Sequence, residues 1–417
     1  MKKIIIEGGK KLKGTVKISG MKNAAVAVLP AALLAEDSSE VTNIPEISDV
    51  FVIKEIMEYL GAEVKFEDKK AFINPNGITS KPIKEEYSSM FRGSYYFMGV
   101  LLAKFKKVTI YFPGGCAFEP RPIDLHIKGF KELGVKIREE NDVYIMDGSN
   151  MKGANINLTI ASVGATINLM YAACMAKGIT TIENAAKEPE VSNLATMLNS
   201  MGAKVKNAGT STITIIGVDK LHGAYHEVIP DRIEAGTYLV IGALLADKLR
   251  ITNVIPKHFK ALILKLKEAG VHIEVLDDEV IVKRAKKIEP IKVRTNFYPG
   301  FPTDMQPIIT PFLLKAEGLS EIKDNIYESR FKHIFHFNKM GADIKVISGG
   351  IIISGPKKLK GASVEADDLR AGAGLVVAGL IAEGTTTISK ISHLLRGYEG
   401  ICEKLTKIGA KIRIEEK

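Results

Sequence analysis

The sequence is poor in cysteine and has no long apolar segment. Its three cysteines, Cys116, Cys174 and Cys402, are odd in number and far apart along the 417 residues, which is typical of free thiols in a reducing compartment. The longest apolar run, residues 24–35, is shorter than the roughly 20 residues that span a bilayer, and residues 1–7 lack the apolar core of a signal peptide. These absences predict a soluble, cytoplasmic protein.

The sequence also lacks the motifs of metal and nucleotide sites. Its eight histidines form no Cys/His cluster with the spacing of metal ligands. Neither a G-x-x-x-x-G-K-S/T segment nor a G-x-G-x-x-G segment after a strand is present. We therefore predict a protein that needs no metal ion and no cofactor.

The charge of the chain is modest and evenly spread. There are 58 Lys and Arg residues against 48 Asp and Glu, a net charge of +10. A small positive excess favours anionic partners, including phosphorylated metabolites. A nucleic-acid-binding tail would instead show a block of like charges, so we predict no nucleic-acid partner.

What the sequence does contain is a sixfold repeat. A glycine that follows an amphipathic helix pattern and precedes an alternating strand pattern recurs with spacings of 73, 68, 68, 71 and 68 residues, which indicates internal repetition. Such a glycine suits the left-handed residue that ends a helix. The six positions are Gly61, Gly134, Gly202, Gly270, Gly341 and Gly409.

Each repeat also contains an apolar helix upstream of the glycine. A helix that is apolar on all faces must be buried on all faces, so each repeat is predicted to run buried helix, strand, surface helix, strand, strand. Repeats near 70 residues favour closed domains over a solenoid, and three repeats for each of two domains is the expected division, near Pro230. The six apolar helices are expected at residues 23–36, 94–104, 165–177, 237–247, 304–317 and 371–383.

A second recurring segment introduces the strand that enters a buried helix. It occurs at residues 151–153, 221–223 and 359–361, and also at residues 12–14, before the first repeat. We predict that this early copy completes the last repeat. Residues 1–21 would then belong with the C-terminal half.

The starts of the six buried helices are polar or charged, unlike the helices themselves. The carboxylates and the serine there can be explained as helix caps or first-turn acids. Lys22 and the arginines cannot, because a cation at a helix N-terminus opposes the helix dipole unless an anion binds there. If these starts face one another, they form a cationic cleft. The starts are Lys22-Asn23, Arg92, Ser162 to Gly164, Asp231-Arg232, Asp304 and Asp368 to Arg370.

Loops between a strand and a surface helix add further candidates. The Pro- and Gly-rich loop at residues 113–126 carries Cys116, and the corresponding loops of later repeats carry Glu188 with Glu190, Arg330 and Arg396. By contrast, Cys174 and Cys402 lie on apolar helix faces and are expected to be core residues.

Nine segments match those of a known family, in order and over nearly the whole length. The Cys116 loop and the segment Phe-Pro-Thr-Asp-Met-Gln at residues 301–306 are the most specific. The chain resembles the UDP-N-acetylglucosamine 1-carboxyvinyltransferases, the enolpyruvyl transferases that open peptidoglycan synthesis in the cytoplasm. The segments are residues 19–25, 91–94, 113–126, 162–166, 187–190, 230–233, 301–306, 368–370 and 396–399.

The resemblance implies a fold and a reaction. The fold is α/β, with two inside-out α/β barrel domains of three βαβαββ repeats each, residues 22–229 and residues 1–21 with 230–417, and the active site in the cleft between them. The reaction transfers the enolpyruvyl group of phosphoenolpyruvate to the 3-hydroxyl of UDP-N-acetylglucosamine through a tetrahedral intermediate and releases phosphate. It is the first committed step of peptidoglycan precursor synthesis, needed for cell shape and division. No cofactor, metal, membrane, nucleic acid or obligate protein partner is implied.

The resemblance also implies roles for individual residues. Cys116 is the acid that forms an adduct with phosphoenolpyruvate and is the target of fosfomycin, Asp304 is the base for the 3-hydroxyl, and Lys22 and Arg396 are also catalytic. Phosphoenolpyruvate is bound by Lys22, Asn23, Arg121, Arg396 and Cys116. UDP-N-acetylglucosamine is bound by Asn23, Arg92, Arg121, Pro122, Ile123, Asp124, Leu125, Ala161, Ser162, Val163, Gly164, Asp304 and Ile326, with support from Asp231, Glu188, Glu190, Arg330, Asp368 and Arg370.

The chain departs from the family pattern at two places, and other functions stay open. Ile160-Ala161 stands where some relatives carry a basic residue, and Lys187 where arginine is frequent. The sister transferase that acts on shikimate 3-phosphate is one alternative, although its chemistry uses no thiol like Cys116. A nucleic-acid-end enzyme or binding module is another, but no interleaved aromatic and basic face supports it. A duplicate copy kept for regulation is a third.

Overall fold

The computed structural model describes residues 2–90, 92–112, 123–327 and 330–416. The chain divides into two compact units, Gly20–Ile229, here the first unit, and Met1–Ser19 with Pro230–Lys417, here the second unit. The boundary expected from the sequence was residue 22, two residues further along the chain. Gly20 and Met21 belong to the first unit because the Met21 N–H donates to the Ile229 carbonyl at 2.7 Å and a Cβ on Gly20 would collide with the Asn43 carbonyl.

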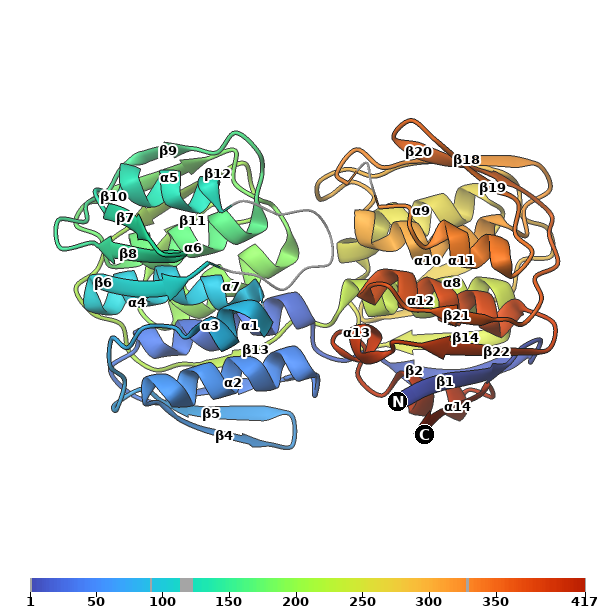
Figure 1. The fold of residues 1–417 in the computed structure, drawn as a ribbon, viewed down its shortest axis with the longest axis horizontal. Helices are drawn as coiled ribbons and strands as arrows, with labels where there is room; N and C mark the ends of the chain where they lie inside the picture. The colour runs from blue at the N-terminus through green and yellow to red at the C-terminus, as the bar shows by residue number, and fades with distance from the viewer. Residues whose placement is uncertain (1, 91, 113–122, 328–329, 417) are drawn as a thin grey trace. The chain divides into compact units, whose positions relative to one another are not determined.

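The described part of the first unit has three sheets around three buried helices (Figure 1). The sheets, in strand order, are β13 (Tyr225–Glu227), β3 (Ser39–Thr42), β5 (Lys70–Asn74) and β4 (Glu63–Glu67); β6 (Lys107–Tyr111), β8 (Val143–Asp147) and β7 (Lys136–Glu140); and β11 (Lys204–Lys206), β12 (Thr212–Ile216), β10 (Ile179–Glu183) and β9 (Asn155–Asn157). The buried helices are α1 (Lys22–Ala31), α4 (Tyr96–Phe105) and α6 (Val163–Cys174), and the outer helices are α2 (Ser48–Leu60), α3 (Glu85–Met90), α5 (Asp124–Glu132) and α7 (Pro189–Ser200), with short 3-10 helices η1 (Ala32–Leu34) and η2 (Arg92–Tyr95).

The second unit repeats this plan. Its sheets are β21 (Ser363–Glu365), β22 (Thr385–Ser389), β1 (Lys2–Glu7) and β23 (Lys411–Glu416); β15 (Ile273–Val275), β16 (Glu279–Val282), β14 (Ala246–Thr252) and β2 (Leu12–Lys17); and β17 (Lys292–Arg294), β18 (Leu319–Lys323), β20 (Gly350–Ser354) and β19 (Ile344–Ile347). Its buried helices are α8 (Arg232–Leu245), α10 (Gln306–Leu313) and α12 (Leu369–Ile381), and the remaining helices are α9 (Lys260–Glu268), α11 (Ile334–Lys339), α13 (Ser392–Leu395), α14 (Ile401–Lys407), η3 (Pro256–Phe259) and η4 (Thr303–Met305).

The six apolar helices lie in the interior, as predicted. Every residue of α10 is buried, and so is every residue of α8 except Leu245. The mixed α/β class is therefore confirmed. Among the described residues, the three sheets of each unit share no strand, so each unit is three sheets packed around helices rather than one closed barrel.

Two glycines let neighbouring buried helices approach closely. A Cβ on Gly99 of α4 would lie 2.4 Å from the Asn168 carbonyl oxygen of α6, and a Cβ on Gly374 of α12 would lie 2.4 Å from the Pro307 carbonyl oxygen of α10. No side chain fits at these separations, so the two glycines set the distance between the helices in each unit. The Gly-Ala pattern around Gly374 is thus a packing feature.

All six repeat glycines adopt the left-handed conformation that the sequence predicts. Their φ angles lie between +88° and +109°. Each follows an outer helix and turns the chain into the next strand, as Gly61 does at the end of α2. The repeat is therefore a structural unit and not only a sequence pattern.

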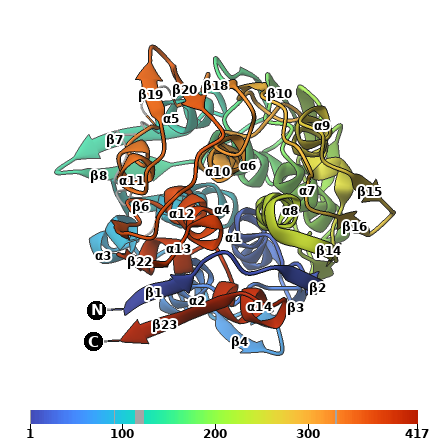
Figure 2. The same cartoon turned by 90° about the vertical axis from the view of Figure 1, so that its right-hand side faces the viewer.

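The N-terminal strands join the second unit, but not in the predicted way. The segment at residues 12–14 lies in β2, which pairs in parallel with β14 of the fourth repeat. The last repeat is completed instead by β1, which lies antiparallel between β22 and β23 (Figures 1 and 2). Since β1 takes the central place in that sheet, β2 has no position there and pairs with β14.

The described residues include no helix that is both long enough and apolar enough to cross a bilayer. The longest buried helix, α8, has 14 residues, and spanning requires roughly 20.

We expect Gly341→Ala to destabilise the protein by about 1 kcal/mol, because an alanine is strained at positive φ. The φ of Gly341 is +92°, and the nearest atom to an added Cβ is 3.7 Å away, so the loss would come from the backbone and not from a collision. Urea denaturation should show it as a lower midpoint. Gly341→Asn is the control and should lose less, since asparagine tolerates this conformation; an equal midpoint for Gly341→Ala and wild type would contradict the assignment.

Candidate active site

In the second unit, a carboxylate lies between two guanidinium groups. Asp304 is in η4, just before α10, and its Oδ1 accepts a hydrogen bond from Arg330 Nη1 at 3.0 Å. Its Oδ2 accepts from Arg370 Nε and pairs with Arg370 Nη2, both at 3.0 Å. The structure thus brings together three residues that are 26 to 66 positions apart in the sequence.

The charge of Asp304 is strongly stabilised. Burial alone would raise its pKa, but the guanidinium groups of Arg370 and Arg330 outweigh burial and hold the pKa well below its usual range. The Asp304 side chain is still 30% exposed, whereas Arg330 and Arg370 are 9% and 5% exposed. Asp304 is therefore an anion at neutral pH that a ligand can reach.

A second acid holds the surrounding loop. Asp324 accepts hydrogen bonds from the hydroxyls of Thr295 and Thr303, both at 2.7 Å, and from the backbone N–H groups of Ile326 and Tyr327, both at 3.0 Å. Arg330 Nη1 donates in turn to the Thr303 hydroxyl at 3.2 Å. The predicted substrate contact Ile326 is thereby tied to the segment that carries Asp304.

Three of the polar helix starts are N-caps. The Asp231 carboxylate accepts from the N–H groups at the start of α8, the Asp368 carboxylate does the same at α12, and the Ser162 hydroxyl accepts from Ala165 at α6. The capping interpretation therefore holds for these three. Asp304 differs, because its oxygens bond to arginine side chains.

Arg396 lies beside the start of α12. It follows α13, and a Cβ on the next residue, Gly397, would lie 2.7 Å from the Leu369 side chain at the first position of α12. The Tyr398 ring lies 5.7 Å from the Arg370 guanidinium. Arg396 is thus anchored next to the helix start that carries Arg370.

In the first unit, Lys22 forms a largely buried ion pair. Its Nζ lies 2.6 Å from the carboxylate of Asp49, and the two side chains are 15% and 3% exposed. Lys22 is the first residue of α1, Asn23 beside it is half-buried, and Asp49 lies in the first turn of α2. The predicted anion-binding lysine is therefore held in place by a carboxylate.

The predicted UDP-sugar contacts of the first unit converge on a small aromatic cluster. The Arg92 guanidinium lies 5.7 Å from the Tyr95 ring, which meets the His126 ring edge-on at 4.9 Å. Gly164 fits against both rings, because a Cβ there would lie 2.7 Å from the Tyr95 hydroxyl. Arg92, the start of α5 and the start of α6 are thereby brought together.

Other predicted residues of the first unit are placed as follows. Glu188 and Glu190 are buried at the start of α7. Asp124 is exposed at the start of α5, and Ile123 just before it is buried. The remaining predicted contacts are partly buried at the starts of α5 and α6; they are Leu125, Ala161, Ser162 and Val163.

Three predicted residues, Cys116, Arg121 and Pro122, lie outside the described residues. The other two cysteines are buried, as predicted. Burial raises the pKa of the Cys174 thiol to about 12, and burial followed by the charge of Glu403 does the same for Cys402. Both are therefore unreactive core thiols.

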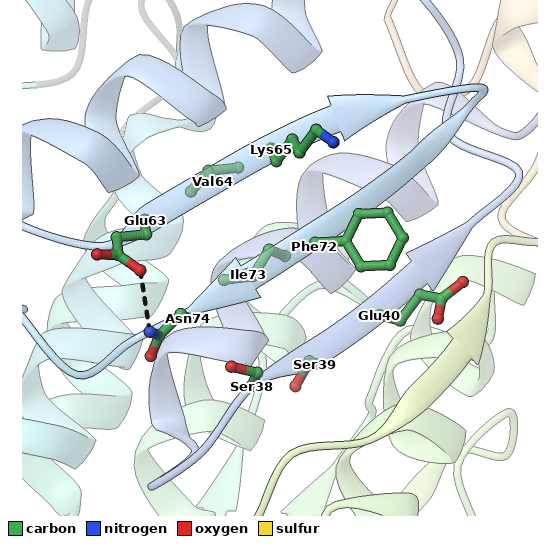
Figure 3. Close-up of a pocket in the computed structure, with 9 residues that line it drawn as sticks. All are labelled: Ser38, Ser39, Glu40, Glu63, Val64, Lys65, Phe72, Ile73 and Asn74. Carbon is green, nitrogen blue, oxygen red and sulfur yellow. Dashed lines mark hydrogen bonds between the residues drawn. The ribbon is translucent and has the colours of Figure 1, made fainter.

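A depression on the outer face of the sheet that contains β3, β5 and β4 contains none of these residues (Figure 3). Its polar groups are satisfied locally: the Asn74 amide donates to Glu63 at 3.0 Å, and Lys65 pairs with Glu67. This depression is therefore not the predicted site. The described residues also contain no cluster of three or more metal-ligating side chains.

Comparison with known proteins assigns the chain to a family. Residues 6–405 match the family described as EPSP synthase (3-phosphoshikimate 1-carboxyvinyltransferase). A protein of Listeria monocytogenes named UDP-N-acetylglucosamine 1-carboxyvinyltransferase 2 is 50% identical over 98% of this chain and 97% of its own length. The chain belongs to the EPSP synthase family. Within that family it groups with the UDP-N-acetylglucosamine 1-carboxyvinyltransferases, as the resemblance predicted; a protein of this name from Bacillus cereus is 46% identical over the whole chain and 97% of its own length.

Solved structures of this family share the fold. The enolpyruvyl transferase NikO from Streptomyces tendae is 26% identical with a TM-score of 0.90, covering 99% of this chain and 98% of that one. EPSP synthase from Acinetobacter baumannii is 20% identical with a TM-score of 0.77 over all of both chains, which is evidence of a common fold alone.

Sequence reasoning missed two acids that hold predicted site residues or the segments around them. Asp49 and Asp324 were not predicted, although each is buried and bonded to a predicted residue or its segment. The place of Asp49 in the first turn of a surface helix was the available signal, but it suits a helix-dipole acid equally well. Only the fold shows that this carboxylate faces Lys22.

We expect Asp49→Ala to destabilise this EPSP synthase family member by about 1–3 kcal/mol, between the values for exposed and buried ion pairs. Asp49→Asn should cost less, because the amide oxygen can still accept from Lys22. Glu58→Ala, which removes the exposed Lys54–Glu58 pair of the same helix, is the control and should change stability by less than about 0.5 kcal/mol. Denaturant titration distinguishes the variants, and equal losses for Asp49→Ala and Glu58→Ala would contradict a special role for the buried pair.

The stability of the Asp304 cluster should depend on pH. A carboxyl has a pKa of about 3.9 in an unfolded chain, and that of Asp304 is lower in the fold, so ionised Asp304 stabilises the fold above about pH 4 and loses this effect as the pH falls further. Asp304→Asn should therefore lower the melting temperature at about pH 7, with a difference from wild type that shrinks below about pH 4. Asp343→Asn, at an exposed acid paired with Lys357, should show almost no difference at either pH; a pH-independent difference for Asp304→Asn would refute the assignment.

Proposed function

We propose that the chain transfers the enolpyruvyl group of phosphoenolpyruvate to the 3-hydroxyl of UDP-N-acetylglucosamine and releases phosphate. The observation that carries this proposal is the 46–50% identity, over nearly the full length, to proteins named for that activity. The anion-binding groups at the helix starts support it, because both substrates carry phosphate groups. We also place the reaction in the cytoplasm, because the few, widely spaced cysteines suit a reducing compartment in which free thiols persist.

The reaction needs an acid, a base and cationic clamps. A proton added to C3 of phosphoenolpyruvate leaves a cation-like centre at C2, which the oxygen of the sugar 3-hydroxyl attacks as its own proton leaves. The tetrahedral intermediate then loses phosphate from C2 and a proton from C3, which restores the double bond. No oxidant, reductant or metal ion is required for these steps.

We assign the role of general base to Asp304, on the condition that one of its contacts with arginine is lost when substrate binds. A carboxylate held by two guanidinium groups is a poor proton acceptor, because its pKa is far below the operating pH. Phosphate and carboxylate groups pair well with arginine, so a bound substrate would compete with Asp304 for Arg330 or Arg370. Losing one of these contacts would raise the pKa of Asp304 and improve it as a base.

We assign the binding of phosphoenolpyruvate to cations of both units. Lys22, with Asn23 beside it, would bind the substrate from the first unit and Arg396 from the second, joined by Arg121. Cys116 would supply the proton to C3. Its roles and those of Arg121 rest on the family resemblance, as both lie outside the described residues.

The remaining assignments concern the second substrate and the support of the site. We assign the UDP-sugar to Arg92, the starts of α5 and α6, Asp304 and Ile326. Asp231, Asp368, Glu188 and Glu190 would keep helix starts in place, since they are buried or capping groups. The interdomain position of the site remains a prediction.

Phosphate release with phosphoenolpyruvate and each candidate acceptor tests the proposal. We expect turnover with UDP-N-acetylglucosamine and none with shikimate 3-phosphate. Asp304→Asn should lower the rate by at least about 100-fold, the usual contribution of a general base, whereas Asp343→Asn should leave it unchanged. Turnover with shikimate 3-phosphate alone would transfer the proposal to the sister activity, and turnover with neither acceptor would refute it.

A further inference from the structure

His126 occupies an unusual place in the first unit. It lies in the first turn of α5, directly after Asp124 and Leu125, yet the residue is only 5% exposed. Burial, followed by the charge of Arg92, lowers its pKa to about 3. The imidazole is therefore neutral at physiological pH and does not act as a cation.

A buried hydrogen-bond chain sets the orientation of this ring. Asn168 Oδ1 accepts from the backbone N–H of Gly99 at 2.8 Å, and Asn168 Nδ2 lies 3.0 Å from His126 Nδ1. Since a backbone N–H only donates, the oxygen of the amide must face Gly99 and its NH2 group must face His126. His126 Nδ1 is therefore the acceptor, and the proton of the neutral ring is on Nε2.

Asn168 thereby links three helices through one side chain. It belongs to α6, Gly99 to α4 and His126 to α5. The α4 and α6 backbones are already fixed at close approach by Gly99. The hydrogen bond from Asn168 extends this rigid pair to the first turn of α5.

The imidazole also contacts Tyr95 and the start of α6. The Tyr95 ring packs edge-on against it with centroids 4.9 Å apart. A Cβ on Gly164 would lie 3.2 Å from His126 Cε1, so the start of α6 touches the ring directly. One buried side chain thus contacts two segments to which UDP-sugar binding is assigned in the first unit, and it directly follows a third, residues 123–125.

We propose that His126 is a positioning residue that sets the geometry of the UDP-N-acetylglucosamine-binding segments at residues 92–95, 123–125 and 161–164. This inference rests on the proposed function. His126 itself touches no substrate and exchanges no proton; it acts through Tyr95, Gly164 and the α5 backbone.

A purely apolar core residue would not serve this purpose equally well. An apolar side chain packs in many orientations, whereas a buried polar chain is favourable only when all its members are paired. The Gly99–Asn168–His126 chain therefore selects one placement of α5 relative to α6. Small errors in the placement of binding groups are costly for an enzyme.

Steady-state kinetics of His126→Leu test the proposal. We expect the KM for UDP-N-acetylglucosamine to rise about tenfold, while kcat and the KM for phosphoenolpyruvate change less than about threefold, the pattern of binding lost equally in the ground state and the transition state. His126→Asn, whose oxygen can replace Nδ1 as acceptor, should restore most of the affinity. His226→Leu is the matched control, because His226 is an equally buried histidine on β13 of the same unit, and it should leave both KM values unchanged.

Further measurements keep the outcomes distinct. If His126→Leu does not fold, Asn168→Ala carries the test, since it removes the same hydrogen bond from the other side and should raise the same KM. An unchanged KM in the variant that folds, or an equal rise in His226→Leu, would overturn the proposal. Wild-type protein that releases no phosphate with UDP-N-acetylglucosamine would instead refute the proposed function.

Discussion

The main constraint on this structure is that its central helices have no polar face. Every residue of α10, and all but the first residue of α12, is buried, so these helices offer only their ends for chemistry. The first turn of any helix leaves unpaired N–H groups, and Asp231, Asp368 and Ser162 satisfy them at three of the six starts. Because the sides of these helices are buried in the core, the polar groups of the candidate site lie at the helix starts.

Three cations of the candidate site are each paired with an acid. Lys22 is paired with Asp49, and Arg330 and Arg370 are both paired with Asp304. An unpaired cation at a helix N-terminus would be unfavourable. When the cation is paired with an acid, an anionic ligand can replace that acid as its partner. The same pairing that stabilises the fold keeps the proposed anion-binding groups ordered, at the cost of some affinity for an anion.

Local patterns predict the repeats well and the tertiary contacts poorly. The left-handed glycines, the apolar helices and the core placement of Cys174 and Cys402 depend on neighbouring residues, and all agree with the structure. The strand at residues 12–17 was assigned to the wrong repeat, because pairing with β14 joins positions more than 230 residues apart. Asp49 and Asn168 were missed for the same reason: nothing in their local sequence shows which distant side chain they face.

The connection between the units shows how the helix starts are fixed. Strand β2 precedes α1 in the chain but pairs with β14, and β13 precedes α8 but pairs with β3. Each passage from one unit to the other therefore lies between an entry strand and a buried helix, at residues 19–20 and 229–230. The two passages are held by backbone hydrogen bonds, from Met21 to Ile229 and from Asp231 to Ser19. Lys22 and Asp231 therefore lie next to hydrogen-bonded backbone and not at the end of an unsupported loop. A precise binding geometry requires support of this kind.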